Sequence, residues 1–128
     1  MIVVDTSVWV AVLRGQLGRD AHILGELIDH DLAAVAQPVR QELRAGLSTR
    51  DRRGVLDRLS ALPVVVPTEE TWARVEQWTD RAAEAGERFG LADLLIASLA
   101  QDLGGLVWTR DRDFERMARL NMVQLYSA

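Results

Sequence analysis

The stretch Ile2-Val3-Val4-Asp5-Thr6-Ser7 at the start of the chain decides the fold class. Three β-branched apolar residues in a row are typical of a short strand that is buried on both faces. The three polar residues that follow are of types that favour the start of a helix. A buried strand that leads directly into a helix predicts an α/β fold with a parallel sheet.

The rest of the chain repeats this alternation of short apolar runs and helical segments. Four more strands are predicted, at residues 32–36, 64–66, 106–108 and 122–125. Helices are predicted from about residue 6 to 15, at 20–29, from 38 onward, and at 49–62, 68–85, 90–101 and 113–120. We therefore expect residues 1–128 to form a single domain, with a parallel sheet of about five strands flanked by helices.

The composition excludes several kinds of chemistry. The chain has no cysteine, which rules out disulfides, thiol nucleophiles and zinc–thiolate sites and fits a reducing compartment. All 15 basic residues are arginine, so neither a Schiff-base lysine nor a phosphate-loop lysine is available. The formal charge of −4 argues against a large nucleic-acid footprint but permits a small basic site.

The sequence also predicts a location away from membranes. No stretch approaches the roughly 18 apolar residues that a transmembrane helix needs. The N-terminal segment has no basic region and carries an acid at Asp5, unlike a secretory signal peptide. We expect a cytoplasmic protein.

Acidic residues follow two of the predicted strands. Ligand sites of open parallel sheets lie beyond the carboxyl ends of the strands, where the strand order reverses. Asp5 follows the first strand, while Asp111 and Asp113 follow the strand at 106–108. Each of these acids also suits the cap of the helix that comes next, so capping remains an alternative for each.

Two more acids lie within predicted helices. Asp93 is the only charged residue between Arg88 and Asp102, in a helix that is apolar nearly all round. A buried carboxylate needs a cation, a partner or a proton, although backbone amides of the first helical turn are an alternative partner. Glu42 lies beside the apolar stripe of its helix, where a solvated surface residue is the alternative.

Together these acids predict a metal site. Three or four carboxylates without histidine or cysteine form a hard oxygen site, which suits Mg²⁺ or Mn²⁺ better than zinc. The chemistry that most needs such a site is phosphodiester or phosphoryl transfer. The start of the helix at Thr6-Ser7 adds backbone donors for an anion, and Ser7 is placed to hold a metal-bound water.

Four motifs give the chain a resemblance to a known family. The motifs are V-V-D-T-S-V-W at 3–9, V-x-x-E-L at 39–43, A-D-L-L-I-A-S-L-A at 92–100 and T-R-D-R-D-F at 109–114. With these motifs the chain is similar to PIN domains, and in order, spacing and length to the VapC toxins of bacterial toxin–antitoxin pairs. Each motif is weak alone, but the four in this order cover nearly the whole chain and are specific.

The resemblance implies a set of site residues. The family's catalytic, metal-binding acids match Asp5, Glu42, Asp93 and Asp111. Asp113 matches an acid that only some members use, so whether it is a metal ligand or a helix cap stays open. The hydroxyl near the metal matches Thr6 or, preferably, Ser7, and Thr109 matches a supporting hydroxyl. One departure is Leu94, where many members carry a small residue.

The resemblance also implies a fold, an activity and partners. The strand order would be 3-2-1-4-5, which places the ends of the first and fourth strands side by side. The activity would be that of a Mg²⁺- or Mn²⁺-dependent endoribonuclease, with tRNA or rRNA as the expected substrate. The family further implies a homodimer and a cognate VapB-like antitoxin.

Arginines and tryptophans suggest where other molecules bind. We expect Arg40, Arg44, Arg110 and Arg112 to contact substrate phosphates around the metal. The first two belong to the densest basic stretch, which continues with Arg50, Arg52 and Arg53. A solvated face with ion pairs to Asp51 and Asp57 is the alternative. Of Trp72 and Trp78, we expect at least one at a dimer or antitoxin surface.

Two other functions compete with the nuclease. A metal-dependent phosphatase would use Asp5 as its nucleophile, but it would need a second acid where the chain has Ser7. A non-catalytic PIN-like module that binds RNA or protein would be expected to lack one or more of the four acids. All four are present, which favours the nuclease.

Overall fold

The structure is a computed structural model that describes residues 1–15 and 18–128. Its strands are β1 (Ile2–Val4), β2 (Ala33–Ala36), β3 (Val64–Val65) and β4 (Leu106–Trp108). All neighbouring strands are parallel, in the order β3-β2-β1-β4. The predicted α/β fold with a parallel sheet is therefore confirmed, and β1 and β4 are neighbours as expected.

The prediction of a fifth strand at 122–125 is wrong, since the described residues form a sheet of four strands. A single parallel bridge joins Val107 to Leu125 beside β4. It has two hydrogen bonds, from Val107 N to Gln124 O at 2.9 Å and from Tyr126 N to Val107 O at 2.9 Å. The apolar pattern of this segment instead reflects packing, because Met122 is fully buried in the core.

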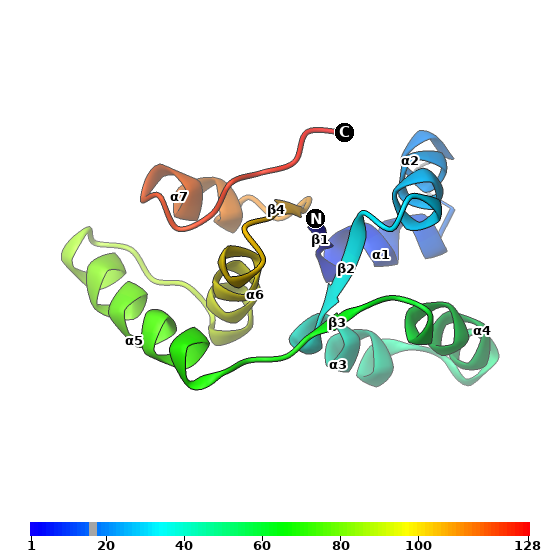
Figure 1. Ribbon diagram of the computed structural model, residues 1–128, viewed down its shortest axis with the longest axis horizontal. Coiled ribbons are helices and arrows are strands. Elements are labelled where there is room, and N and C mark those ends of the chain that lie inside the picture. Colours follow the sequence, from blue (N-terminus) through cyan, green and yellow to red (C-terminus); the bar gives the residue numbers. More distant parts are fainter. Residues whose placement is uncertain (16–17) are drawn as a thin grey trace.

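Seven helices are described. They are α1 (Thr6–Leu13), α2 (Gly18–Asp29), α3 (Gln37–Gly46), α4 (Thr49–Ser60), α5 (Glu69–Glu84), α6 (Leu91–Asp102) and α7 (Asp113–Arg119). Figure 1 shows α5 and α7 to the left of the strands, and α2 and α4 to the right. Helix α6 lies between α5 and the sheet and contacts both. Among the described residues, none of the helices combines the length and apolarity needed to cross a bilayer.

Local sequence explains where these helices begin. Pro38 lies in the first turn of α3, where a missing N–H has no intrahelical partner to lose. At the start of α5, the Thr68 hydroxyl accepts from the Thr71 backbone N–H, and the Thr71 hydroxyl accepts from the Thr68 N–H. This reciprocal capping box satisfies two amides that the helix cannot pair internally.

The register between β1 and β4 is what positions the functional end of the sheet. Val3 lies opposite Val107, and Val4 lies opposite Trp108. The parallel pairing continues one residue beyond the strands, where the Asp5 N–H donates to the Trp108 carbonyl at 2.8 Å. Asp5 is thereby held beside the segment that follows β4.

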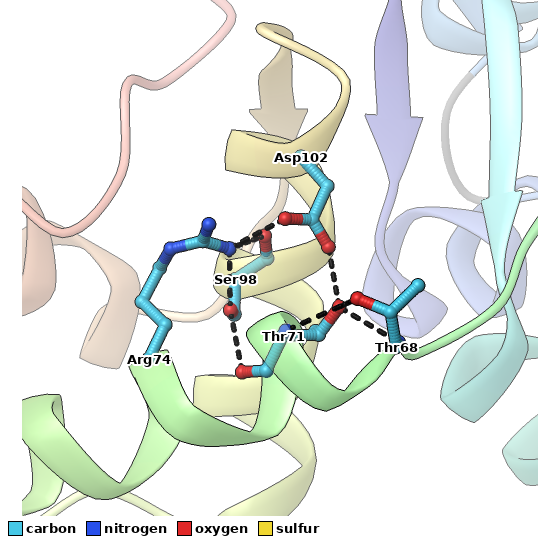
Figure 2. A network of polar contacts seen from close by, with 5 residues as sticks. All are labelled: Thr68, Thr71, Arg74, Ser98 and Asp102. Atoms are coloured by element: carbon cyan, nitrogen blue, oxygen red, sulfur yellow. Dashed lines mark hydrogen bonds and ion pairs between the residues drawn. The ribbon is translucent and has the colours of Figure 1, made fainter.

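A buried polar network fixes α6 against α5 (Figure 2). The side chains of Thr71 and Ser98 are fully buried. The Thr71 hydroxyl donates to Asp102 Oδ2 at 2.5 Å, and the Ser98 hydroxyl donates to the Thr71 carbonyl at 3.0 Å. Arg74 completes the network by donating to Asp102 Oδ1 at 2.6 Å and to the Ser98 hydroxyl at 3.0 Å. Because α6 carries Asp93, this network also fixes the position of that acid.

We predict that Thr71→Ala lowers the free energy of unfolding by about 2 kcal/mol, because it removes one half of the capping box of α5 and the buried hydroxyl that donates to Asp102. Urea unfolding would measure the change. Thr79→Ala, the same substitution on the exposed face of the same helix, should change the value by less than about 0.5 kcal/mol. Equal losses in the two variants would contradict a structural role for the network.

Candidate metal centre

Asp5 is buried at the end of β1, with 5% of its surface exposed. It is the N-cap of α1, and its Oδ2 accepts from the Ser7 N–H at 3.4 Å. The same oxygen accepts from the Ser7 hydroxyl at 2.7 Å and from the Thr109 hydroxyl at 2.8 Å. Asp5 is therefore both a helix cap and a member of the acidic site. Its other oxygen receives no hydrogen bond from the described residues, which leaves it available to a cation.

The hydroxyls of Ser7 and Thr109 join the ends of β1 and β4. The Ser7 hydroxyl accepts from the Arg110 N–H at 2.9 Å, and the Thr109 hydroxyl accepts from the Asp111 N–H at 3.0 Å. Each hydroxyl therefore donates a hydrogen bond to Asp5 and accepts one from a backbone N–H of the loop after β4. Of the two hydroxyls considered from the sequence, Ser7 lies beside Asp5, and its proton is engaged by that carboxylate.

Three acids come together at the end of β4. Carboxylate oxygens of Asp93, Asp111 and Asp113 all lie within 4.8 Å of one another. Asp113 is the first residue of α7, and its N–H donates to Asp111 Oδ1 at 2.9 Å. It is therefore Asp111 that serves the first turn of α7, while the cap position belongs to Arg112. The side chain of Asp113 is part of the acidic group.

Asp93 carries the strongest electrostatic signal of the site. It lies half-buried in the first turn of α6, and none of the described residues donates a hydrogen bond to its carboxylate. Burial raises the pKa of Asp93 to about 6, with further increases from the charges of Asp111, Asp5, Asp113 and Glu42. The alternative of backbone amides as partners is not what the structure shows. The carboxylate instead lacks a counter-charge.

Glu42 lies at the edge of this site, on α3. Its Oε1 accepts from the Thr6 hydroxyl at 3.1 Å. Loss of surrounding water raises the pKa of Glu42, the hydrogen bond from Thr6 opposes the rise, and the charge of Asp5 adds to it. Glu42 and Asp5 thus act electrostatically on the site, although they lie outside the compact group formed by Asp93, Asp111 and Asp113.

The predicted substrate arginines lie on α3, which carries Glu42, and in the loop after β4, which carries Asp111. Arg44, Arg110 and Arg112 are exposed, and Arg40 is partly exposed. Within residues 1–15 and 18–128, none of these four forms an ion pair, and neither do Arg50, Arg52 or Arg53. The alternative in which this basic stretch pairs with Asp51 and Asp57 is therefore not what the structure shows.

Sequence reasoning missed Arg116 and its partner Glu87, although it singled out the other partner, Asp113. Arg116 Nη2 donates to Asp113 Oδ1 at 2.8 Å, and Nη1 pairs with Glu87. The spacing of three residues between Asp113 and Arg116 on one helix was a usable signal. Glu87 gave no such signal, because it lies 29 residues away in the loop between α5 and α6.

The donor set fits a hard divalent cation. Every candidate ligand is a carboxylate oxygen, and the nearest hydroxyls come from Ser7 and Thr109. Several acids confined to one site repel one another, and the raised pKa of Asp93 reports that repulsion together with its burial. A divalent ion would relieve both effects at once, and oxygen ligands are those that Mg²⁺, Mn²⁺ and Ca²⁺ prefer.

Comparisons with known proteins agree with this geometry. The PIN domain family matches residues 2–120. Ribonuclease VapC11 of Mycobacterium tuberculosis is 32% identical, covering 99% of this chain and 98% of the relative. The solved VapBC2 of Rickettsia felis, bound to a promoter DNA fragment, superposes with a TM-score of 0.82 at 21% identity, covering 98% of each chain. VapBC-5 of M. tuberculosis, from the VapBC family of toxin–antitoxin systems, gives 0.71 at 26%, covering 98% and 97%.

We predict that Asp93→Asn stabilises the metal-free protein at pH 7. A raised pKa means that the folded state favours the protonated acid, so wild-type stability falls as pH rises from about 4 through 6. The shift would be worth about 3 kcal/mol if fully buried, and solvent screening reduces this to about 1–2 kcal/mol. Urea unfolding in EDTA would show a gain of this size at pH 7 that narrows toward pH 4.

The control is Asp57→Asn, at an exposed position on α4. It measures how an aspartate-to-asparagine change affects stability where the carboxylate is not buried. A gain for Asp93→Asn that is the same at pH 4 and pH 7, or that is matched by Asp57→Asn, would rule out the cost of ionising this half-buried carboxylate as its cause.

Proposed function

We propose, since the chain belongs to the PIN-domain family and to the VapC ribonucleases within it, that it is the toxin of a type II toxin–antitoxin pair. Its reaction is the metal-dependent endonucleolytic hydrolysis of RNA phosphodiester bonds. The observation that carries this proposal is the group formed by Asp93, Asp111 and Asp113, which lies at the switch point of a parallel sheet and lacks a full counter-charge.

The proposed cofactor is Mg²⁺ or Mn²⁺. Asp93 and Asp111 are its main ligands, with Asp113 beside them and with Asp5 and Glu42 completing the acidic shell. When bound, such an ion orients the phosphate, activates water and offsets the charge that develops on the phosphate oxygens. The site fits this role because its candidate ligands are all carboxylates.

The chain's own residues prepare the site for this ion. Ser7 and Thr109 hold one oxygen of Asp5 and leave the other for the cation. Thr6 holds Glu42 at the edge. Near pH 6, Asp93 exchanges a proton with solvent, so metal binding should release a proton there. These hydroxyl donors thus fix Asp5 and Glu42 before any ligand arrives, which lowers the reorganisation that binding requires.

RNA binding is assigned to the exposed arginines around the acids. Arg40 and Arg44 lie on the same helix as Glu42, and Arg110 and Arg112 lie on the loop after β4. Their positions on both sides of the site suit contacts with the phosphates that flank the cleaved bond. This local basic rim reconciles an RNA substrate, proposed to be tRNA or rRNA, with a net charge of −4.

The proposed partners are a VapB-like antitoxin and a second copy of the chain. VapBC complexes are among the solved structures that this chain resembles. Of the two tryptophans considered above, Trp72 is 44% exposed, whereas Trp78 is buried in the core. An exposed tryptophan is typical of protein interfaces, which supports a partner on that face of α5. A cytoplasmic location fits the absence of cysteine.

The competing functions fit the geometry less well. A phosphatase that uses Asp5 as its nucleophile would need a second acid two residues later, where the chain has Ser7, whose hydroxyl donates to Asp5 instead. A purely binding module has no need for a half-buried acid without a hydrogen-bond donor. The retention of Asp93 in that environment favours a catalytic, metal-dependent role.

We predict that the purified, antitoxin-free protein cuts tRNA or rRNA at discrete sites with Mg²⁺ or Mn²⁺ but not with EDTA. Asp93→Asn should lower the cleavage rate at least about a hundredfold, because it removes a metal ligand worth several kcal/mol to the transition state. Gel analysis of the RNA ends would measure both effects. Asp57→Asn, purified identically, should cut like the wild type.

The same assay separates the nuclease from its alternatives. Equal cleavage by Asp93→Asn and the wild type that persists in EDTA would identify a contaminating ribonuclease, whereas equal cleavage that EDTA abolishes would contradict the proposed role of Asp93. Specific RNA binding without cleavage under any metal condition would favour the non-catalytic module.

We also predict that Ser7→Ala lowers the cleavage rate about tenfold while Mn²⁺ still binds, because Ser7 positions Asp5 and the loop after β4 without supplying a carboxylate. Metal titration and single-turnover cleavage would be compared in the same preparation. Ser7→Thr retains the hydroxyl and should recover part of the rate. A Ser7→Ala variant with full activity would show that the Thr109 hydroxyl alone suffices.

A further inference from the structure

Arg116 is attached directly to the acidic site from the middle of α7. Its guanidinium donates to Asp113 Oδ1 at 2.8 Å and pairs with Glu87 in the loop that precedes α6. The guanidinium carbon also lies 4.9 Å from the centre of the Phe89 ring. Three contacts from two segments of the chain therefore hold this side chain, which is one-third exposed, in one place.

Asp113 is shared between this arginine and the three-acid group. Its carboxylate lies within 4.8 Å of ligand atoms of both Asp93 and Asp111, yet one of its oxygens accepts from Arg116. Hydrogen bonds to Asp113 and Glu87 raise the pKa of the guanidinium, so Arg116 remains a cation under all conditions of interest. The site thus contains one fixed positive charge among its carboxylates.

A purely structural role does not explain this arrangement. Both ion pairs are partly exposed, with 45% of the Asp113 side chain and 30% of the Glu87 side chain accessible. Pairs that are this exposed contribute little to stability. The guanidinium has a direct effect on metal binding, because it occupies one oxygen of Asp113 and its positive charge repels a divalent ion nearby.

We propose that Arg116 is a positioning residue that holds Asp113 as a partly neutralised acid and so sets how tightly the site binds a divalent ion. This inference rests on the proposed metal-dependent function. In this arrangement Asp93 and Asp111 remain free of basic partners among the described residues, whereas Asp113 must leave Arg116 to become a full ligand. Arg116 competes with the metal for Asp113.

The test is Mn²⁺ binding, measured by isothermal titration calorimetry on the full chain. Arg116→Gln should lower the Mn²⁺ dissociation constant about five- to tenfold, because it frees Asp113 and removes a nearby positive charge. Arg119→Gln makes the same charge change on the same helix at an exposed position, and should stay within about twofold of the wild type. Thermal unfolding of each variant confirms that it is folded.

Two further variants test whether Arg116 changes the Mn²⁺ affinity through Asp113. Glu87→Gln breaks the other arm of the ion pair and should leave Mn²⁺ affinity within about twofold of the wild type. In an Asp113→Asn background, Arg116→Gln should no longer change the dissociation constant by more than about twofold. An effect that persists in this background, or that Glu87→Gln reproduces, would overturn a role exerted through Asp113.

The outcomes also separate this inference from the proposed function. Mn²⁺ binding by the wild type that is lost in Asp93→Asn supports the metal site. If that holds and Arg116→Gln binds Mn²⁺ no more tightly than Arg119→Gln, the role of Arg116 is overturned and the metal site stands. If the folded wild type binds no Mn²⁺, the metal-dependent function and the inference built on it both fail.

Discussion

Repulsion among carboxylates is the constraint around which this molecule is organised. The parallel pairing of β1 with β4 brings Asp5 to the segment that carries Asp111 and Asp113, and α6 adds Asp93. Left alone, such a group would push its members apart or take up protons. The fold prevents the first outcome by fixing each acid through its backbone or through a hydroxyl donor. The second outcome is favoured at Asp93, where burial first and the neighbouring charges second raise the pKa to about 6, and the pKa of Glu42 is raised as well.

The acids of the site differ in the hydrogen-bond donors that stabilise their charges. Asp5 is stabilised by donors from its own helix and from Thr109. Asp111 accepts an amide of α7, and Asp113 accepts from Arg116. Asp93 has neither, and it lies on α6, whose residues 94–100 are all buried and which the network of Figure 2 holds to α5. Rigidity from that network substitutes for the local hydrogen bonds that Asp93 lacks.

Much of this arrangement could be predicted from the sequence because it depends on local patterns. Short apolar runs located β1 to β4, and the Thr68 and Thr71 pair located the start of α5. Asp93 stood out as one acid in an apolar helix. The prediction failed at residues 122–125, where the same apolar pattern serves core packing and forms only one bridge to β4. Periodicity cannot distinguish those two uses of a short apolar segment.

Contacts between residues far apart in sequence could not be predicted, because local patterns do not show which distant segments meet. The bond from Thr71 to Asp102 spans 31 residues, and the pair of Arg116 with Glu87 spans 29. Nothing in the composition of either segment indicates its partner. The membership of Asp113 in the acidic group likewise depends on the turn of the loop after β4, which places its backbone amide on Asp111 and its side chain near Asp93.

The double use of Asp5 has a consequence for how such a chain evolves. One carboxylate both caps α1 and belongs to the acidic site, so most replacements at this position weaken the fold as well as the chemistry. Asp93 carries no comparable structural duty. Under selection against a harmful nuclease, lineages that lose activity at Asp93 would keep a folded protein able to occupy its partners. Lineages that change Asp5 would lose the protein itself to degradation.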